Sequence, residues 1–272
     1  MPQIIRSSLN RSASLPALPA RFYKYRSLTG SSAHWTETIL RKNELFFATR
    51  RHFNDPFDCR PCFVTKATAA QKQKFLYDIL KSGGYASSTK LSKLSKLAKA
   101  LIDHPVYEEA LSDAIRHLEN RLDNHTGILC LSTKPDNILM WSHYADSHRG
   151  VCLGFEGENG SCPFPAAKPV HYQPRRAVCN PVLASREEMK RSTLFTKLDT
   201  WAYEEEWRVT SGTGSGSKSF APQTLKEIIL GAKISEESEA LVRSWIRWRW
   251  YPIKVRRAVL RQDQFGIIIR RA

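Results

Sequence analysis

Three consecutive glutamates lie between two tryptophans at residues 201–208, which have the sequence WAYEEEWR. If this segment is a strand, alternation of side chains places Glu204 and Glu206 on one face and Glu205 on the other. Two carboxylates on one face repel each other unless a basic group or a ligand lies between them. The segment therefore predicts either an acidic catalytic site or an edge strand whose glutamates pair with the chain's many arginines.

Two further segments carry candidate functional side chains. Asn54, Asp55 and Asp58 lie in the turn FNDPFD at 53–58, and loops that follow strands often hold functional residues. The same turn is equally typical of an Asx-turn that only organises the chain. His143 in WSHYA is a candidate general base, because histidine exchanges protons near neutral pH, although a single histidine is also common in a protein core.

These acidic groups allow a second kind of enzyme. A metal-dependent nuclease needs several oxygen ligands around Mg²⁺, and two acidic segments with one histidine could supply them. The residues concerned are Asp55, Asp58, Glu204, Glu206 and His143. No other metal site is expected, since the single C-x-x-C at 59–62 has no second pair of ligands at matching spacing.

The run RSWIRWRWY at 243–251 interleaves arginine with aromatic residues. Aromatic rings can stack on bases while guanidinium groups hold phosphates, so Arg247, Trp248 and Arg249 are candidate nucleic-acid contacts. On a helix, however, Trp245 and Trp248 share one face, as they would in a helix that packs on a core. This run also permits a chain that binds nucleic acid without catalysing a reaction.

Composition indicates the class of partner but not the reaction. The chain has 272 residues and a net charge of +16, which favours an anionic partner such as nucleic acid. No apolar run is long enough to span a membrane, and the first residues lack the apolar stretch of a signal peptide, so a cytoplasmic protein with reduced cysteines is expected. The basic, serine-rich segment 1–20 would also suit the delivery signal of a secreted effector.

The elements that must position these residues alternate between strands and helices. Strands are predicted at 21–28, 44–49, 127–133, 150–156, 170–173, 206–210, 225–232, 252–259 and 264–270. Helices are predicted at 36–42, 137–144, 183–203 and 235–248, with loops at 83–84 and 157–170 and a flexible tip at 211–219.

A helical block at 67–125 interrupts the strand-rich pattern, and its leucines recur at helical spacing beside a row of lysines. Such a lysine row is more typical of a solvated helix face than of a nucleic-acid contact. We therefore expect a flexible basic arm at 1–20, followed by a single α+β domain at 21–272 that carries this helical insertion.

Six segments, in order along the chain, resemble a large bacterial domain-of-unknown-function family, number 2971. They are FYKYRSL (22–28), LFFATRRHFNDPFDC (45–59), CLST (130–133), MWSHYADSHRGVCLGF (140–155), WAYEEEWRV (201–209) and LKEIILGA (225–232). The resemblance covers roughly residues 21–270. It implies a shared fold but supplies no reaction.

The same order of motifs is similar, more weakly, to the DarT-type nucleic-acid ADP-ribosyltransferases. That resemblance implies a mixed or antiparallel β-sheet core, NAD as a substrate and nucleic acid or protein as the acceptor. It also implies a bacterial toxin or phage-defence effector that has an antitoxin or another defence protein as partner.

The DarT-type resemblance also implies roles for individual residues. Glu206 would be the catalytic glutamate, and Glu204 would be the upstream acid that orients or deprotonates the acceptor. Tyr144 would stack on the nicotinamide. The remaining cofactor contacts would be Lys24, Tyr25, Arg26, Asn54, Asp55 and Ser132, where Lys24 replaces the His or Arg usual in that class.

Overall fold

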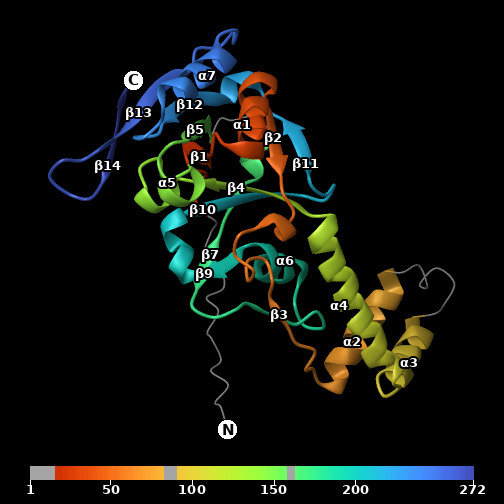
Figure 1. The fold of residues 1–272 in the computed structure, drawn as a ribbon. Coiled ribbons are helices and arrows are strands. Elements are labelled where there is room, and N and C mark those ends of the chain that lie inside the picture. Colours follow the sequence, from red (N-terminus) through yellow and green to blue (C-terminus); the bar gives the residue numbers. More distant parts are fainter. Residues whose placement is uncertain (1–15, 83–90, 158–162) are drawn as a thin grey trace.

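The computed structural model of the 272-residue chain describes residues 16–82, 91–157 and 163–272. Most of the predicted basic arm and the predicted loop at 83–84 lie outside these residues. The described chain contains both helices and a large mixed sheet, which confirms the predicted α+β class (Figure 1).

The main sheet has eight strands, and only one neighbouring pair is parallel. In spatial order the strands are β14 (Ile267–Arg271), β13 (Lys254–Leu260), β12 (Leu225–Leu230), β5 (Val151–Glu156), β1 (Arg21–Arg26), β4 (Gly127–Ser132), β10 (Glu206–Ser211) and β6 (Lys168–Pro169). The parallel pair is β12 with β13. The sheet is therefore largely antiparallel, as predicted.

The middle of this sheet is partly open. β1 pairs with β5 at six positions but with β4 at one position, Tyr23 opposite Ser132. β4 is paired along its whole length on its other side, with β10. Beyond Tyr23 the residues of β1 therefore diverge from β4, and this divergence makes room for a ligand between two central strands.

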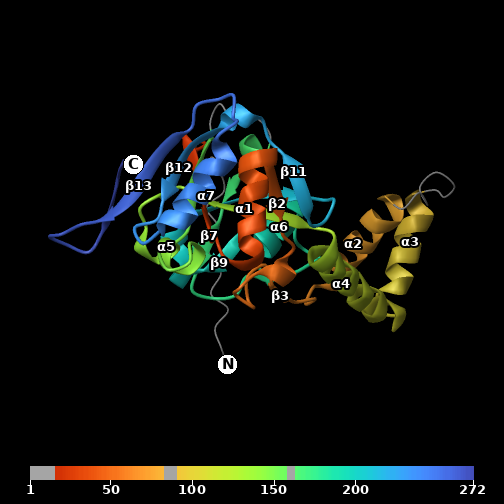
Figure 2. The same cartoon turned by 45° about the horizontal axis from the view of Figure 1, so that its top comes forward.

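Helices cover both faces of the sheet. α1 (Gly30–Lys42) and α7 (Glu236–Ile246) lie side by side on one face, where Ile39, Leu40 and Val242 enter the main core (Figure 2). α5 (Ile138–Tyr144) covers the other face, and its Trp141 is fully buried against β1 and β5. Burial of these apolar faces from water is the main force that holds the layers together.

The helical insertion stands to one side of the sheet (Figures 1 and 2). It consists of α2 (Ala69–Ser82), α3 (Leu91–Leu101) and α4 (Val106–Asn124), so the prediction of helices within 67–125 is confirmed. An ion pair of 2.7 Å between Arg50 Nε and Asp123 Oδ1 ties the end of α4 to the body. Residues 69–82 and 91–124 of the insertion contribute no side chain to the cleft described below.

A short strand pair corrects the prediction for residues 211–219. The predicted flexible tip at 211–219 is wrong, because β11 (Gly216–Ser219) pairs with β2 (Glu44–Phe47). Gly214 has a φ of 78°, and Gly216 one of 155°, so glycine lets the chain turn sharply into this pairing.

The predicted helix at 183–203 is also wrong in its second half. α6 (Arg186–Leu194) begins at a capping box formed by Ser185 and Glu188, and it ends ten residues before Glu204, the first of the three glutamates. Thr196–Leu198 forms β9, which pairs in parallel with β7 (His171–Gln173), and Asp199–Glu204 forms a short 3₁₀ helix. Pairing with a distant strand outweighs the local helical pattern here.

Candidate active site

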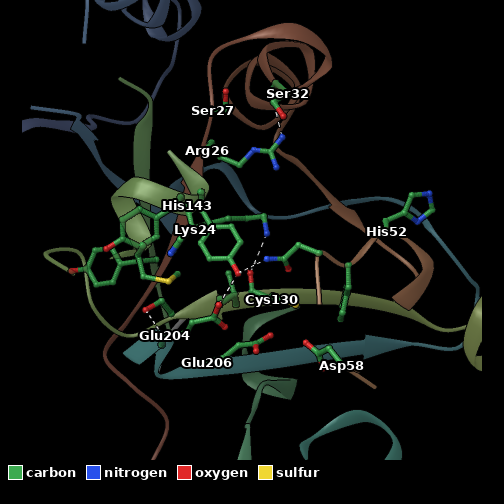
Figure 3. A pocket seen from close by; sticks show the side chains of 18 of the residues that line it. Lys24, Arg26, Ser27, Ser32, His52, Asp58, Cys130, His143, Glu204 and Glu206 are labelled. Atoms are coloured by element: carbon green, nitrogen blue, oxygen red, sulfur yellow. Dashed lines mark hydrogen bonds between the residues drawn. The ribbon is translucent and has the colours of Figure 1, made fainter. Parts of the chain in front are cut away.

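A cleft of about 450 Å³ opens where β1 diverges from β4 (Figure 3). Basic side chains from β1 form one wall, and acidic side chains near the start of β10 form the other. The predicted site residues that line it are Lys24, Tyr25, Arg26, Asn54, Ser132, His143, Tyr144, Glu204 and Glu206. Segments that are far apart in sequence therefore meet in one cavity.

The glutamates are brought together by a route that differs from the predicted strand. Glu204 ends the 3₁₀ helix, Glu205 has a left-handed φ of 42°, and Glu206 begins β10. The turn at Glu205 directs Glu204 and Glu206 inward, where both are buried. Glu205 instead stays near the surface and accepts a hydrogen bond from Thr133. The predicted grouping is right, although the predicted alternation along one strand is wrong.

Lys197 of β9 connects three buried carboxylates. Its Nζ lies 2.5 Å from Glu204 Oε2, 3.1 Å from Glu206 Oε2 and 3.5 Å from Asp58 Oδ2. The sequence reasoning missed this lysine, because its segment was assigned to a helix and no motif marks it. A buried cation between the glutamates removes the repulsion that the acidic run would otherwise cause.

Arg208 is fully buried below the same carboxylates. Its guanidinium donates to both oxygens of Glu206, at 2.7 and 2.8 Å, and to Asp58 Oδ2 at 2.7 Å. It also donates to the Leu194 carbonyl and to the Cys59 sulfur. One signal for this residue was present in the sequence: Arg208 follows Glu206 by two positions, which is the same face of a strand.

The network separates the protonation behaviour of the two glutamates. Burial alone would raise the pKa of Glu206, but the charges of Arg208 and Lys197 outweigh burial and lower the pKa to about 2. Burial raises the pKa of Glu204, and Lys197 only partly opposes this. Glu206 is therefore a fixed anion, whereas Glu204 is the carboxyl better suited to exchange a proton.

Tyr144 links Glu204 to the cleft. Its hydroxyl donates to Glu204 Oε1 at 2.6 Å and accepts a hydrogen bond from Asn54 Nδ2 at 3.4 Å. Burial, followed by the charge of Glu204, raises the pKa of Tyr144, so the tyrosine remains a neutral donor. Asn54 of the turn at 53–58 and Tyr144 of α5 thus meet beside Glu204.

Lys24 and Arg26 form the basic wall of the cleft. Lys24 Nζ donates to the carbonyl of Cys130 on β4 at 3.0 Å, across the opening between the two strands. Burial, with a smaller contribution from Arg26, lowers the pKa of Lys24 to about 8. Arg26 donates to Thr36 and to the Ser32 carbonyl, which fixes its side chain against α1.

Other predicted cofactor contacts are engaged mainly in supporting the cleft. The Tyr25 hydroxyl donates to the Lys134 carbonyl, and the Ser132 hydroxyl donates to the Glu204 carbonyl at 2.6 Å. Ser132 therefore positions the backbone of Glu204. Asp55 does not line the cleft, because its carboxylate accepts from the Phe57 amide in an Asx-turn.

His143 is exposed at the mouth of the cleft. Its ring lies about 6.4 Å from the rings of Tyr144 and Tyr203 and 6.5 Å from that of Trp201. No hydrogen bond from His143 to a carboxylate occurs within the described residues. It is thus closer to an aromatic edge of the cleft than to the acidic network.

The C-terminal arginine–tryptophan run lies outside this cleft. α7 ends at Ile246, so the shared helix face predicted for Trp245 and Trp248 is wrong, and Trp248 is 80% exposed. Arg247 lies over the Trp248 ring. Arg249 donates to the carbonyls of Leu40 and Pro222, which gives it a structural role.

The structure brings together four of the five residues that the nuclease alternative names, Asp58, His143, Glu204 and Glu206, in the lining of one cleft, without Asp55. Among residues 16–82, 91–157 and 163–272, no three His, Cys, Asp or Glu side chains are arranged to hold a metal ion. Asp58, Glu204 and Glu206 do meet, but their partners are Lys197 and Arg208. The five cysteines in the described part of the chain are free thiols, and none of its helices has the length and apolarity to cross a membrane.

Residues 140–209 match the family model described as Protein of unknown function (DUF2971). This segment runs from α5 to β10 and includes Tyr144, Lys197, Glu204, Glu206 and Arg208. The match confirms the family resemblance predicted from the sequence, and the family description names no reaction. No curated protein matches the chain, and no solved structure does.

Proposed function

We propose that this protein is an NAD-dependent ADP-ribosyltransferase that acts on nucleic acid. The observation that carries the proposal is the single cleft in which a basic wall faces an acidic network (Figure 3). A dinucleotide with a pyrophosphate needs cations, whereas departure of nicotinamide needs negative charge close to the ribose. Both kinds of group line the same cavity.

The basic wall suits the phosphates. Lys24 and Arg26 present two cations on one strand, and guanidinium groups bind phosphates well because their donors match the oxygens in geometry. Tyr144 offers a ring and a neutral hydroxyl beside the carboxylates, which suits a nicotinamide or ribose group. These residues are the proposed NAD contacts.

The two glutamates have different proposed roles. Cleavage of the bond to nicotinamide leaves positive charge on the ribose, and a fixed anion nearby stabilises that charge. Glu206 supplies this anion, since Arg208 and Lys197 keep it ionised. Glu204 takes the proton from the acceptor, because its raised pKa brings it closer to the operating pH.

The net charge of +16 supports a nucleic-acid acceptor, because phosphate contacts supply most non-specific affinity for nucleic acid. We further propose a toxin or phage-defence role in the bacterial cytoplasm, restrained by an antitoxin or another defence protein. A metal-dependent nuclease has less support, since the carboxylates that it would use are paired with Lys197 and Arg208.

The test is release of nicotinamide from NAD by the purified protein in the presence of single-stranded DNA, RNA or bacterial lysate. Mass spectrometry of each pool detects an added ADP-ribose and identifies the acceptor. Glu204→Gln is expected to lower the rate at least 100-fold, because general base catalysis contributes about 10²–10⁴-fold.

Glu205→Gln is the matched control. It makes the same chemical change at the next residue, whose side chain lies near the surface and outside the cleft. Its rate is expected to equal that of the wild type. No nicotinamide release from the folded wild-type protein in any pool would overturn the proposal, as would equal rates for Glu204→Gln and Glu205→Gln.

A further inference from the structure

A second cavity of about 240 Å³ adjoins the cleft. Asp58 and Lys197 line both cavities, so these two side chains form the wall between them. Asp58 Oδ2 is held by Arg208, whereas Asp58 Oδ1 is buried and has no hydrogen-bond partner in the described chain. A ligand in the second cavity would therefore lie directly beside the cleft.

The rim of this cavity combines positive charge with an exposed aromatic ring. Arg60, Arg175 and Arg176 line it, together with Phe57, whose side chain is unusually exposed at 61%. The Arg176 guanidinium lies 5.7 Å from the centre of the Phe57 ring. Arg176 also donates to the carbonyls of Arg60 and Pro61, and these hydrogen bonds hold its guanidinium in place beside the Phe57 ring.

The charges of the rim are incompletely balanced. Arg60 contacts Asp123 at 3.4 Å, but the described residues provide no ion-pair partner for Arg175 or Arg176. Of the two acidic residues that line the cavity, Asp55 accepts a hydrogen bond from the amide of Phe57, and Asp58 is paired with Arg208 and Lys197. A phosphate backbone would complement the exposed guanidinium groups, and a base would cover the exposed ring.

We propose that this second cavity and its rim bind the acceptor as single-stranded nucleic acid. Phe57 stacks on a base, and the rim arginines hold the adjoining phosphates, which is the usual combination in proteins that bind single strands. A single strand fits better than a duplex, because stacking on Phe57 requires a base that is not enclosed in a helix. The proposal rests on the proposed transferase only for the identification of this strand as the acceptor.

The test is fluorescence anisotropy with a fluorescein-labelled 12-nucleotide single-stranded DNA of mixed sequence and with RNA of the same sequence, both without NAD. Phe57→Ala is expected to weaken binding about tenfold, since stacking contributes about 1–3 kcal/mol per base. Phe57→Trp should preserve or strengthen binding. Arg175→Gln should reduce the dependence of log affinity on log salt concentration by about one unit.

Phe265→Ala is the matched control, since it removes a fully exposed phenylalanine from the distant β13–β14 turn. It should leave the affinity at the wild-type value. Equal losses for Phe57→Ala and Phe265→Ala would overturn the proposal, as would a loss confined to Trp248→Ala in the C-terminal run. Equally tight, Phe57-dependent binding of polyglutamate would also overturn it, because the site would then recognise negative charge without bases.

The binding assay distinguishes this proposal from the proposed reaction. Strand binding that depends on Phe57 in a protein that releases no nicotinamide would support the site and refute the transferase. Nicotinamide release with no affinity for either single strand would support the transferase and refute the strand-binding site.

Discussion

Two segments of this chain mix tryptophan with charged residues, but they differ in which side chains are buried. In residues 201–208 three of the four charged side chains are buried: Glu204, Glu206 and Arg208 are each less than 5% exposed. In residues 243–251 the aromatic side chains beyond α7 are exposed, with Trp248 at 80% and Trp250 at 95%, whereas Trp245 packs on the core. Similar composition therefore produces a closed ionic network in one place and an open surface in the other.

The difference comes from ionic partners that other elements of the chain supply. Asp58 and Lys197 reach the first segment from other elements, so each buried charge faces an opposite charge. In the second segment Arg249 finds only backbone carbonyls, and Arg247 finds the ring of Trp248. Burial of charge requires paired and hydrogen-bonded partners, and Glu204, Glu206 and Arg208 all have them.

The largest expected effect is a loss of stability when one charge is removed from the buried network. Arg208→Met would leave Glu206 and Asp58 without their main partner, while keeping an unbranched side chain in the core. Removal of one partner from a buried ion pair typically costs about 3–5 kcal/mol. Urea denaturation at neutral pH should show a loss of this size in the free energy of unfolding.

Trp248→Ser makes the corresponding change in the open segment. Surface substitutions usually change stability by less than about 0.5 kcal/mol, and Trp248 lies on the surface. Similar losses in the two variants would contradict the contrast between the segments. So would a loss below about 1 kcal/mol for Arg208→Met.

An intermediate effect is expected on the free energy of unfolding at low pH. The pKa of Glu206 falls from an ordinary 4.5 to about 2 in the folded protein, so its ionised form stabilises the fold above pH 4.5. This contribution is lost as pH falls from about 4.5 towards 2, by at most about 1.4 kcal/mol per pH unit. The stability difference between wild type and Glu206→Gln should therefore narrow over that range.

Denaturation curves at pH 5, 4 and 3 measure this difference. Glu205→Gln serves as the reference, because its side chain lies near the surface, and its curve should stay parallel to the wild type. A wild-type-to-Glu206→Gln difference that is constant from pH 5 to 3 would mean that Glu206 is not held as a fixed anion.

Much of the fold was predictable because periodic patterns and turn residues act locally. The strands at the centre of the sheet, the helices of the insertion and the apolar face of α5 all follow such patterns. The failures at 196–198 and 216–219 share one cause, since both segments become strands only by pairing with distant partners, β7 and β2. Nothing in their own residues specifies those partners.

The site was predictable to the extent that it lies in dense motifs. Glu204, Glu206, Tyr144, Lys24 and Arg26 were identified from such motifs, and the structure brings them into one cleft. Lys197 was missed, because a single lysine becomes informative only when three carboxylates surround it. Similarly, the rim of the second cavity joins loops at 55–61 and 174–177, which no local spacing relates.

The smallest expected effect is on NAD affinity, and it follows from the different pKa shifts of Lys197 and Lys24. Burial lowers the pKa of Lys197 less than three carboxylates raise it, so its pKa lies above the ordinary value. Lys24 has the carbonyl of Cys130 as its hydrogen-bond partner and the cation of Arg26 nearby, and its pKa falls to about 8.

Below pH 8 Lys24 is charged and can hold a phosphate, whereas above pH 8 the neutral form predominates. At pH 9 only about one-tenth of the molecules keep the charge, so NAD affinity measured by calorimetry should fall roughly tenfold between pH 7 and 9. Lys24→Met should bind NAD weakly and equally at both values, because it has no charge to lose. A wild-type affinity that does not change with pH would show that the basic wall holds phosphate through Arg26 alone.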